Sequence, residues 1–232
     1  MAKKILLVDN RLDPPRGSPD LRRYLIDGAV VVARRGPERD LPTDLTAYIH
    51  IVLSGSRASC LSHEEWVEEV VGLVQDASAK NIPILGVCFG HQMIARAFGG
   101  IESLRKSVTP EFGWIRVKNH HAGHDDDPLF APLAPEFYSF ASHHEEVHSL
   151  PPDLEITASN DRCAIQGLRH RRHPVFGVQF HPERNATEGE NSMRSQRGKV
   201  PKDALLNVGK GAQYFDESIP RILFQSFLEL KR

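Results

Sequence analysis

The sequence predicts an α/β fold: a doubly wound, mostly parallel central sheet flanked by helices, with extra antiparallel strands in the C-terminal half. Before residue 100, apolar runs of strand length alternate with segments whose apolar residues recur at helical spacing. That alternation is typical of parallel strands joined by crossover helices. The run at residues 82–87 is apolar throughout, and the run at 4–9 is apolar between its charged end residues, so both strands are expected to be buried on two faces.

The elements of the first half follow from local residue patterns. Residues 10–20 are rich in proline, arginine and glycine and predict a loop, and a short helix is expected at 21–27. Ser62 and Glu65 have the spacing of a capping box, which opens a helix with inward positions from 66 to 77. Strands are predicted at residues 4–9, 29–33, 48–54 and 82–87.

After residue 100 the pattern changes to short runs with turn signals between them, which predicts antiparallel strands added to the edge of the sheet. The last helix is expected at residues 220–230, with Ser218 as its cap. Its inward residues would be Ile222, Leu223, Phe227 and Leu230. The strands of this half are predicted at 136–140, 154–158, 163–167 and 174–180.

Composition limits the classes of function. The 232 residues suit one domain, spanning 1–232. A formal net charge of −1 and a pI near 6.9 leave no basic footprint for nucleic acid. No apolar run approaches membrane-spanning length, and the first strand begins too soon for a signal peptide. Three cysteines without zinc-site spacing or a disulfide framework favour a reducing compartment, so a cytoplasmic protein is expected.

The clearest chemical motif is a turn between a buried strand and a helix. Cys88 stands at this turn, with Gly86 and Gly90 on either side and a helical pattern at 89–98. This is the Gly-x-nucleophile-x-Gly pattern of a nucleophile elbow, with cysteine as the nucleophile. The glycines are needed because strand and helix nearly touch there. The alternative interpretation is a cysteine that merely packs at a tight turn.

The position of this cysteine has a chemical consequence. A helix N-terminus has unpaired N–H groups and a favourable dipole, so it stabilises a thiolate. The amide of Phe89 is then free to stabilise a developing oxyanion.

A second motif supplies the groups that a thiol nucleophile requires. An apolar strand ends at His181, and Glu183 follows two residues later. The histidine can take and return a proton while the carboxylate orients its ring. Pro182 holds His181 in an extended conformation. Alone, this tripeptide could equally be a surface turn.

With both motifs present, the chain resembles the class I (triad) glutamine amidotransferase domain, and is closest to GMP synthetase amidotransferases and their stand-alone relatives. The resemblance spans about residues 4–183 in matching order and spacing. Residues 108–117 also look like this subgroup. The matching stretches are residues 86–92 and 181–183, the loop at 53–56, and residues 142–147.

The resemblance implies a flavodoxin-like fold, no cofactor and a set of roles. Cys88 would attack the side-chain amide of glutamine, and His181, oriented by Glu183, would protonate the departing ammonia. Water would then hydrolyse the γ-glutamyl thioester. By the same resemblance, the oxyanion hole would use Gly55, Ser56 and Phe89, and the substrate's α-amino and α-carboxylate groups would be held by Gln92, Ser142 and His143.

Departures from the family pattern leave two functions open. The usual Ser-Gly-Gly-Pro loop reads Ser-Gly-Ser-Arg, ending at Arg57, and Glu145 stands where aspartate is common. No synthetase domain follows the motifs. Either a separate synthetase or acceptor subunit uses the ammonia, or the chain is a hydrolase, for which a γ-glutamyl peptide is the alternative substrate. A third hypothesis, an inactive binding module, is disfavoured by the intact cysteine, histidine and glutamate.

Two further segments need interpretation. Residues 120–127 contain histidines and aspartates, but their spacing fits no helical two-histidine site, so a solvated loop is expected and no metal. Residues 184–216 are polar and glycine-bearing, with a basic cluster, and predict a mobile surface loop. The alternative for this segment is a lid or docking surface, because it follows directly after the His-Pro-Glu motif.

Overall fold

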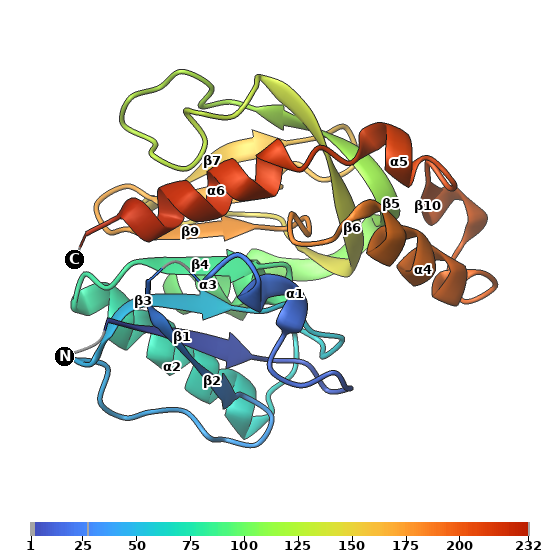
Figure 1. The fold of residues 1–232 in the computed structure, drawn as a ribbon. Coiled ribbons are helices and arrows are strands. Elements are labelled where there is room, and N and C mark those ends of the chain that lie inside the picture. The colour runs from blue at the N-terminus through green and yellow to red at the C-terminus, as the bar shows by residue number, and fades with distance from the viewer. Residues whose placement is uncertain (1–2, 27, 232) are drawn as a thin grey trace.

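Parallel strands form the middle of the sheet. The computed structural model describes residues 3–26 and 28–231. In spatial order these strands are β2 (Val30–Arg35), β1 (Lys4–Asp9), β3 (Tyr48–Leu53), β4 (Ile84–Val87) and β9 (Val175–Val178) (Figure 1). All of these neighbours pair in parallel. The order places β4, which precedes Cys88, directly beside β9, which precedes His181.

The sheet continues beyond β9 with antiparallel strands from the second half of the chain. These are β8 (Gly167–His170), β7 (Leu154–Ser159), β5 (Leu104–Asn119) and β6 (Glu136–Val147). A short strand, β10 (Leu205–Leu206), pairs with β5 in parallel. The predicted fold, a mostly parallel sheet with antiparallel additions, is therefore confirmed.

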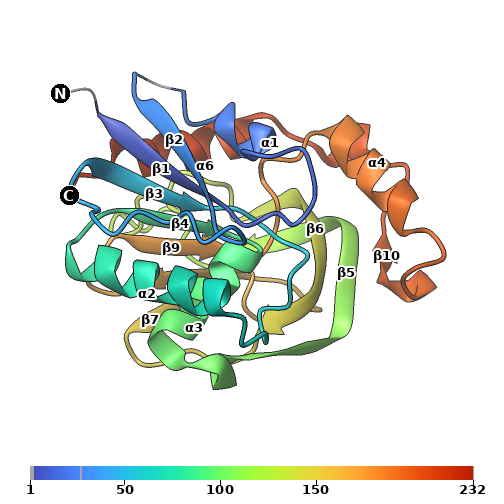
Figure 2. The same cartoon turned by 90° about the horizontal axis from the view of Figure 1, so that it is seen from below.

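Helices cover both faces of the parallel strands. Figure 2 shows α2 (Glu65–Ala79) and α3 (Phe89–Gly99) on one face and α6 (Ser218–Glu229) on the other. The short α1 (Pro19–Arg22) lies on the side of α6, where the neighbouring Tyr24 stacks on Phe224 at 5.0 Å. The remaining elements are α4 (Ala186–Gln196), α5 (Gly211–Tyr214) and the 3-10 turns η1 (Ile101–Ser103) and η2 (Lys202–Ala204).

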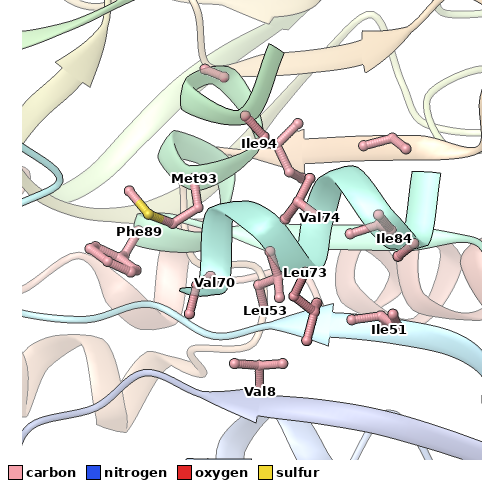
Figure 3. Packing of buried hydrophobic residues seen from close by; sticks show 14 of the residues in the cluster. Val8, Ile51, Leu53, Val70, Leu73, Val74, Ile84, Phe89, Met93 and Ile94 are labelled. Atoms are coloured by element: carbon pink, nitrogen blue, oxygen red, sulfur yellow. The ribbon is translucent and has the colours of Figure 1, made fainter. Parts of the chain in front are cut away.

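The core lies in two layers, one on each face of the sheet. On the α2 and α3 side, Leu53, Val74 and Met93 pack in one cluster (Figure 3). On the α6 side, Leu7 and Leu223 belong to a separate cluster. Successive side chains of a strand point to opposite faces, and nearly all of β1 and all of β4 is buried, as predicted from their apolar runs. No helix of the described residues is both long and apolar enough to span a membrane.

The second half differs from the prediction in three ways. The run at 174–180 forms β9, which is parallel to β4 in the middle of the sheet instead of antiparallel at its edge. The expected strand at 163–167 is wrong, because β8 begins only at Gly167. The long β5 was not predicted, because its outward residues are exposed and its pairing with β6 is interrupted between Lys106 and Glu111.

Both predicted helix caps are wrong. Helix α2 begins at Glu65 and its cap position is Glu64, two residues after Ser62, whose hydroxyl instead accepts from the Glu64 amide at 3.1 Å. Ser218 is the first residue of α6, and its own amide donates to Asp216 at 2.9 Å. The expected helix at 21–27 ends at Arg22 in the structure, and residue 27 lies outside the described residues.

Residues 184–216 fold into α4, η2, β10 and α5 and are therefore not a continuous loop. A complete capping box opens α4: the Asn185 side chain accepts from the Glu188 amide, and the Glu188 carboxylate accepts from the Asn185 amide. Met193 packs with Trp114 and Phe140. The helix was missed because Met193 is its one buried apolar residue, which produces no helical periodicity in the sequence.

Candidate active site

Cys88 occupies a strained backbone position between β4 and α3. Its φ of 52° and ψ of −104° lie in a region that residues with a side chain rarely adopt. The turn is held by hydrogen bonds on both sides: the Cys88 amide donates to the Val178 carbonyl at 2.8 Å, and its carbonyl accepts from the Gln92 amide at 3.1 Å. Such strain persists where the surroundings determine it, as at a nucleophile elbow.

The two glycines of the elbow are required by close packing, as the sequence predicts. A Cβ atom on Gly86 would collide with the backbone of Gly90. A Cβ atom on Gly90 would lie 2.5 Å from the carbonyl oxygen of Leu53, on the neighbouring strand β3. Strand and helix can therefore approach this closely only where neither residue has a side chain.

His181 and Glu183 lie just beyond the end of β9. The His181 amide donates to the Phe140 carbonyl of β6 at 2.6 Å, which fixes the backbone. Its Nδ1 lies 2.7 Å from Glu183 Oε1. Both side chains are buried, with 10% of the His181 side chain and 2% of the Glu183 side chain exposed. The carboxylate can therefore orient the imidazole and stabilise its protonated form.

The structure brings the cysteine and the histidine to one place. A Cβ atom on Gly55 would lie 2.9 Å from His181 Cε1 and 3.5 Å from Cys88 Cβ, so both side chains border the same glycine. The Cys88 sulfur is also close enough to the imidazole to raise its pKa. Parallel pairing explains the meeting, because adjacent parallel strands end at the same edge of a sheet.

The electrostatics favour a charged imidazole. Burial opposes protonation of His181, but the Glu183 carboxylate and the Cys88 sulfur outweigh it and raise its pKa to about 10. Burial would raise the pKa of Glu183, yet the positive His181 holds it below its ordinary value. Each residue of this pair therefore stabilises the charged form of the other.

The loop after β3 carries Gly55 and Ser56 beside Cys88, and its shape is held by two clamps. Glu145 of β6 accepts hydrogen bonds from the Ser59 hydroxyl and the Cys60 amide, each at 2.7 Å. In the sequence Glu145 stands out only as a departure from the family pattern; the structure shows that its carboxylate anchors this loop.

The second clamp is a buried arginine of α3. Arg96 donates to the carbonyls of Cys60 and Ser62 at 2.7 and 2.8 Å and also pairs with Glu68. The loop is thereby tied to the same helix that begins at the elbow. The end of this loop, residues 60–62, cannot shift without breaking these buried hydrogen bonds.

The other predicted contact residues lie around the cysteine. Phe89 is the first residue of α3, and its ring stacks on Trp66 at 5.6 Å. Gln92 lies one turn further on, and its amide nitrogen donates to the Glu145 carbonyl at 2.8 Å. The carbonyl oxygen of Ser142 is 3.9 Å from the Cys88 sulfur. All the predicted contact residues except Phe89 line the same cavity as Cys88.

Gln179 was missed as a site residue although it stands two positions before His181. It is fully buried, and its amide nitrogen lies 3.7 Å from the Cys88 sulfur. The sequence does contain a signal: a polar residue inside an otherwise apolar run that ends at a catalytic-type histidine. A buried amide needs partners, so its position indicates a polar neighbour.

His143 takes part in a buried polar network that the sequence did not predict. Its Nε2 lies 3.0 Å from Glu111 Oε2, and the Glu111 carboxylate also accepts from Asn160 at 2.7 Å and Gln166 at 2.6 Å. Cys163 is close enough that these side chains form a grouping of metal-ligand types. Burial raises the pKa of that thiol to about 12, so it is protonated at neutral pH.

The 120–127 segment forms the turns expected of a loop. His121 Nδ1 lies 2.9 Å from Asp127 Oδ2. The other oxygen of Asp127 accepts from the amides of Leu129 and Phe130, each at 3.0 Å. Asp127 is therefore used in holding the turn that follows.

A cavity of about 1150 Å³ opens above Cys88. Beyond Cys88, His181 and Glu183, the cavity is lined by the 11–23 segment on one side and by α4 on the other. Arg23 joins the walls, because its guanidinium donates to both oxygens of Glu188 at 2.8 and 2.7 Å and also to the Glu183 carbonyl. At the mouth, Arg57 lies 3.2 Å from Asp13 in an exposed pair.

Comparisons with known proteins identify the family of the chain. The sequence model of the family "Glutamine amidotransferase class-I" matches residues 26–198. The chain is 34% identical over 145 residues to a glutamine-hydrolysing GMP synthase subunit of Methanopyrus kandleri, covering 60% of this chain and 68% of the relative. The corresponding protein of Methanocaldococcus jannaschii is 35% identical over 134 residues, covering 58% and 68%.

Solved structures share the whole fold. A glutamine amidotransferase of Thermotoga maritima superposes with a TM-score of 0.74 at 20% identity, covering 99% of this chain and 97% of the other. A glutamine amido transferase of Methylobacillus flagellatus superposes with a TM-score of 0.79 at 18% identity, covering 100% and 97%. At 18–20% identity these structures show only that the fold is shared, whereas the match to the family model rests on the sequence. By its sequence and its fold, this chain belongs to the class-I glutamine amidotransferase family.

Proposed function

We propose that the chain hydrolyses the side-chain amide of glutamine through Cys88, His181 and Glu183, and releases glutamate and ammonia. One observation carries this proposal. Cys88, on a strained elbow, and the imidazole of His181 both border Gly55, and the Nδ1 of that imidazole lies 2.7 Å from the buried Glu183 carboxylate. That is the arrangement of nucleophile, proton carrier and orienting acceptor that acyl transfer requires.

The reaction proceeds in two halves. The Cys88 thiolate attacks the amide carbon of glutamine, and protonated His181 gives its proton to the nitrogen as the carbon–nitrogen bond breaks. Ammonia leaves, and a γ-glutamyl thioester remains on Cys88. Neutral His181 then takes a proton from water, which attacks the thioester carbon. Glutamate departs, and the thiolate and imidazolium are restored.

The loop and the helix N-terminus supply the remaining contacts. The amides of Gly55, Ser56 and Phe89 stabilise the oxyanion that forms in both halves of the reaction. The side-chain amide nitrogen of Gln92 already donates to Glu145, so its oxygen is the atom that accepts from the substrate's α-amino group. The backbone at 142–143 holds the α-carboxylate.

A separate subunit receives the ammonia in this proposal. The similar proteins of M. kandleri and M. jannaschii are each named as one subunit of a GMP synthase. We infer that this chain likewise works with a synthetase subunit that carries the nitrogen acceptor. Residues 184–216, of which α4 lines the cavity, are the segment that we propose moves or docks when the two meet.

The size of the cavity supports a second candidate function. At about 1150 Å³ it lies above the usual range of roughly 300–1000 Å³ for small-molecule sites. Free glutamine is smaller than the ligands for which that range holds. A γ-glutamyl peptide would place its amine portion between the 11–23 segment and α4 while its glutamyl portion occupies the same site.

A substrate panel separates these functions. Glutamate release from glutamine, γ-glutamyl peptides and folate polyglutamates is measured for the wild type and Cys88→Ala, with and without a candidate synthetase subunit. Cys88-dependent release from glutamine, enhanced by the partner, supports the first function. Cleavage of γ-glutamyl peptides in preference to glutamine favours the second.

The matched control is Cys163→Ala, because Cys163 is also buried but lies outside the elbow. Its activity should equal that of the wild type. If the Cys88→Ala variant releases glutamate at the wild-type rate, the proposed function is wrong. A mass increase corresponding to a glutamyl group on Cys88, trapped by rapid acid quenching, would identify the thioester.

A further inference from the structure

The Gln179 side chain lies between Gln92 of α3 and Cys88 of the elbow, the two residues that face the substrate in the proposed reaction. Its side chain is fully buried. The amide nitrogen lies 3.7 Å from the Cys88 sulfur, within hydrogen-bonding distance for sulfur, and its oxygen lies 3.1 Å from the amide nitrogen of Gln92. The proposed reaction assigns no role to this residue.

The direction of these hydrogen bonds follows from one backbone group. The carbonyl oxygen of Glu145 can only accept, so the Gln92 group 2.8 Å from it must be the NH₂ end of that amide. The second proton of this NH₂ group points to Gln179, which must therefore present its oxygen. The NH₂ end of Gln179 is then the end that faces the Cys88 sulfur.

We propose that Gln179 is a positioning residue that donates a hydrogen bond to the Cys88 sulfur and favours its thiolate form. A donor aimed at a group stabilises its negative form, whereas an acceptor there would destabilise it. The chain from the Glu145 carbonyl through Gln92 and Gln179 therefore ties the state of the nucleophile to β6. This inference rests on the proposed role of Cys88 as the nucleophile.

Other groups around the sulfur must be kept constant in any test. His181, beyond β9, and Cys60, on the loop after β3, interact with the sulfur by charge, and Glu183 lies behind His181 at its Nδ1. From β6 comes the Ser142 carbonyl, with Glu145 behind Gln92, whereas the His143 ring is bonded to Glu111 and to the Glu145 carbonyl. Substitution of Gln179 leaves all these groups in place, so a change in thiolate reactivity reports on the amide.

The experiment measures the rate of Cys88 alkylation by iodoacetamide from pH 5 to 10, with the modified residue identified by mass spectrometry. Three proteins are compared: wild type, Gln179→Met, which keeps the length but has no donor, and Gln179→Glu, which replaces the donor by a carboxylate oxygen. The midpoint of the pH profile should rise by about one pH unit in Gln179→Met, because the free energy of a hydrogen bond to a charged group corresponds to a pKa shift of roughly this size. It should rise by more in Gln179→Glu, because a carboxylate oxygen there would disfavour the thiolate.

Matched controls separate positioning from a general loss of structure. Gln75 also donates its side-chain amide to a carbonyl, that of Ala97 at the far end of α3, so Gln75→Met should leave the midpoint unchanged. Circular dichroism verifies folding. Gln92→Met provides a second route: it removes the bond that orients Gln179, and the midpoint should rise by a smaller amount.

The outcomes distinguish this inference from the proposed function. Equal midpoints in the wild type and in a folded Gln179→Glu variant would overturn the positioning role, whatever the glutaminase activity. Glutamate release that survives Cys88→Ala would overturn the proposed function instead. A raised midpoint accompanied by a lower kcat at neutral pH, with kcat partly recovered at higher pH, supports both.

Discussion

Replacing Glu183 by glutamine tests the electrostatics of the site. The substitution keeps the shape of the side chain but removes the charge 2.7 Å from His181 Nδ1. In the wild type the pKa of His181 is raised from 6.5 to about 10. This shift stabilises the folded protein fully below pH 6.5, and the contribution is lost as the pH rises towards 10. The wild type should therefore lose about 3 kcal/mol of unfolding free energy between pH 6.5 and 9 from this group.

In Glu183→Gln most of this pH dependence should disappear. The Glu183 charge is the larger of the influences that raise the pKa of His181, and the Cys88 sulfur alone remains. Urea unfolding at pH 6.5 and pH 9 gives the free energies, and the difference between the two pH values should shrink to less than half of the wild-type value. The Glu217→Gln variant, which removes an exposed carboxylate paired with Arg221, is the control and should show the wild-type difference.

The same variant changes the kinetics. In the proposed reaction His181 is protonated when ammonia leaves, so its raised pKa should keep the wild-type rate from falling until the pH approaches 10. Without the carboxylate, the alkaline limb should move to lower pH, and kcat/KM at pH 7.5 should fall by roughly 100- to 10,000-fold. A variant with the wild-type alkaline limb and the wild-type pH dependence of stability would refute the reasoning.

Further predictions concern the packing around the site. Gly90→Ala should lower the unfolding free energy by about 1–3 kcal/mol, because the new Cβ would lie 2.5 Å from the Leu53 carbonyl oxygen; urea unfolding measures this, and unchanged stability would contradict the close approach. Glu145→Ala should release the loop that carries Gly55 and reduce kcat/KM for glutamine about tenfold, while iodoacetamide still modifies Cys88; unaltered kinetics would show that the clamp is unimportant. Met193→Ala should detach α4 from Trp114 and speed proteolysis within that helix, as limited digestion would detect, whereas wild-type resistance would show that the helix is held elsewhere.

The parts of the fold that could be predicted depend on local patterns. An unbroken apolar run such as that of β4 indicates burial on two faces, and the elbow follows from the spacing of two glycines around Cys88. The direction of β9 could not be predicted, because nothing in a short apolar run says whether its neighbour is parallel. The length of β5 was equally hidden, since exposed residues and an interruption in its pairing break the alternation.

The candidate site divides in the same way. Cys88, His181 and Glu183 could be proposed as site residues because each stands in a motif of adjacent residues. The partnership of Glu111 with His143 could not be found, because it depends on a register in which these residues are directly opposite on β5 and β6. The contact between Gln179 and the sulfur has the same origin, since it exists only once β9 lies beside β4.

The pairing of β4 with β9, two strands that lie far apart in the sequence, has a consequence for synthesis of the protein. The chain emerges from the ribosome with its thiol long before its imidazole, and the gap between β4 and β8 can be filled only after residue 178 has been made. On the proposed function, a nascent or truncated polypeptide would therefore have Cys88 without His181 and could not hydrolyse glutamine. The proposed site is complete only when β9 has inserted between β4 and β8 in the middle of the sheet.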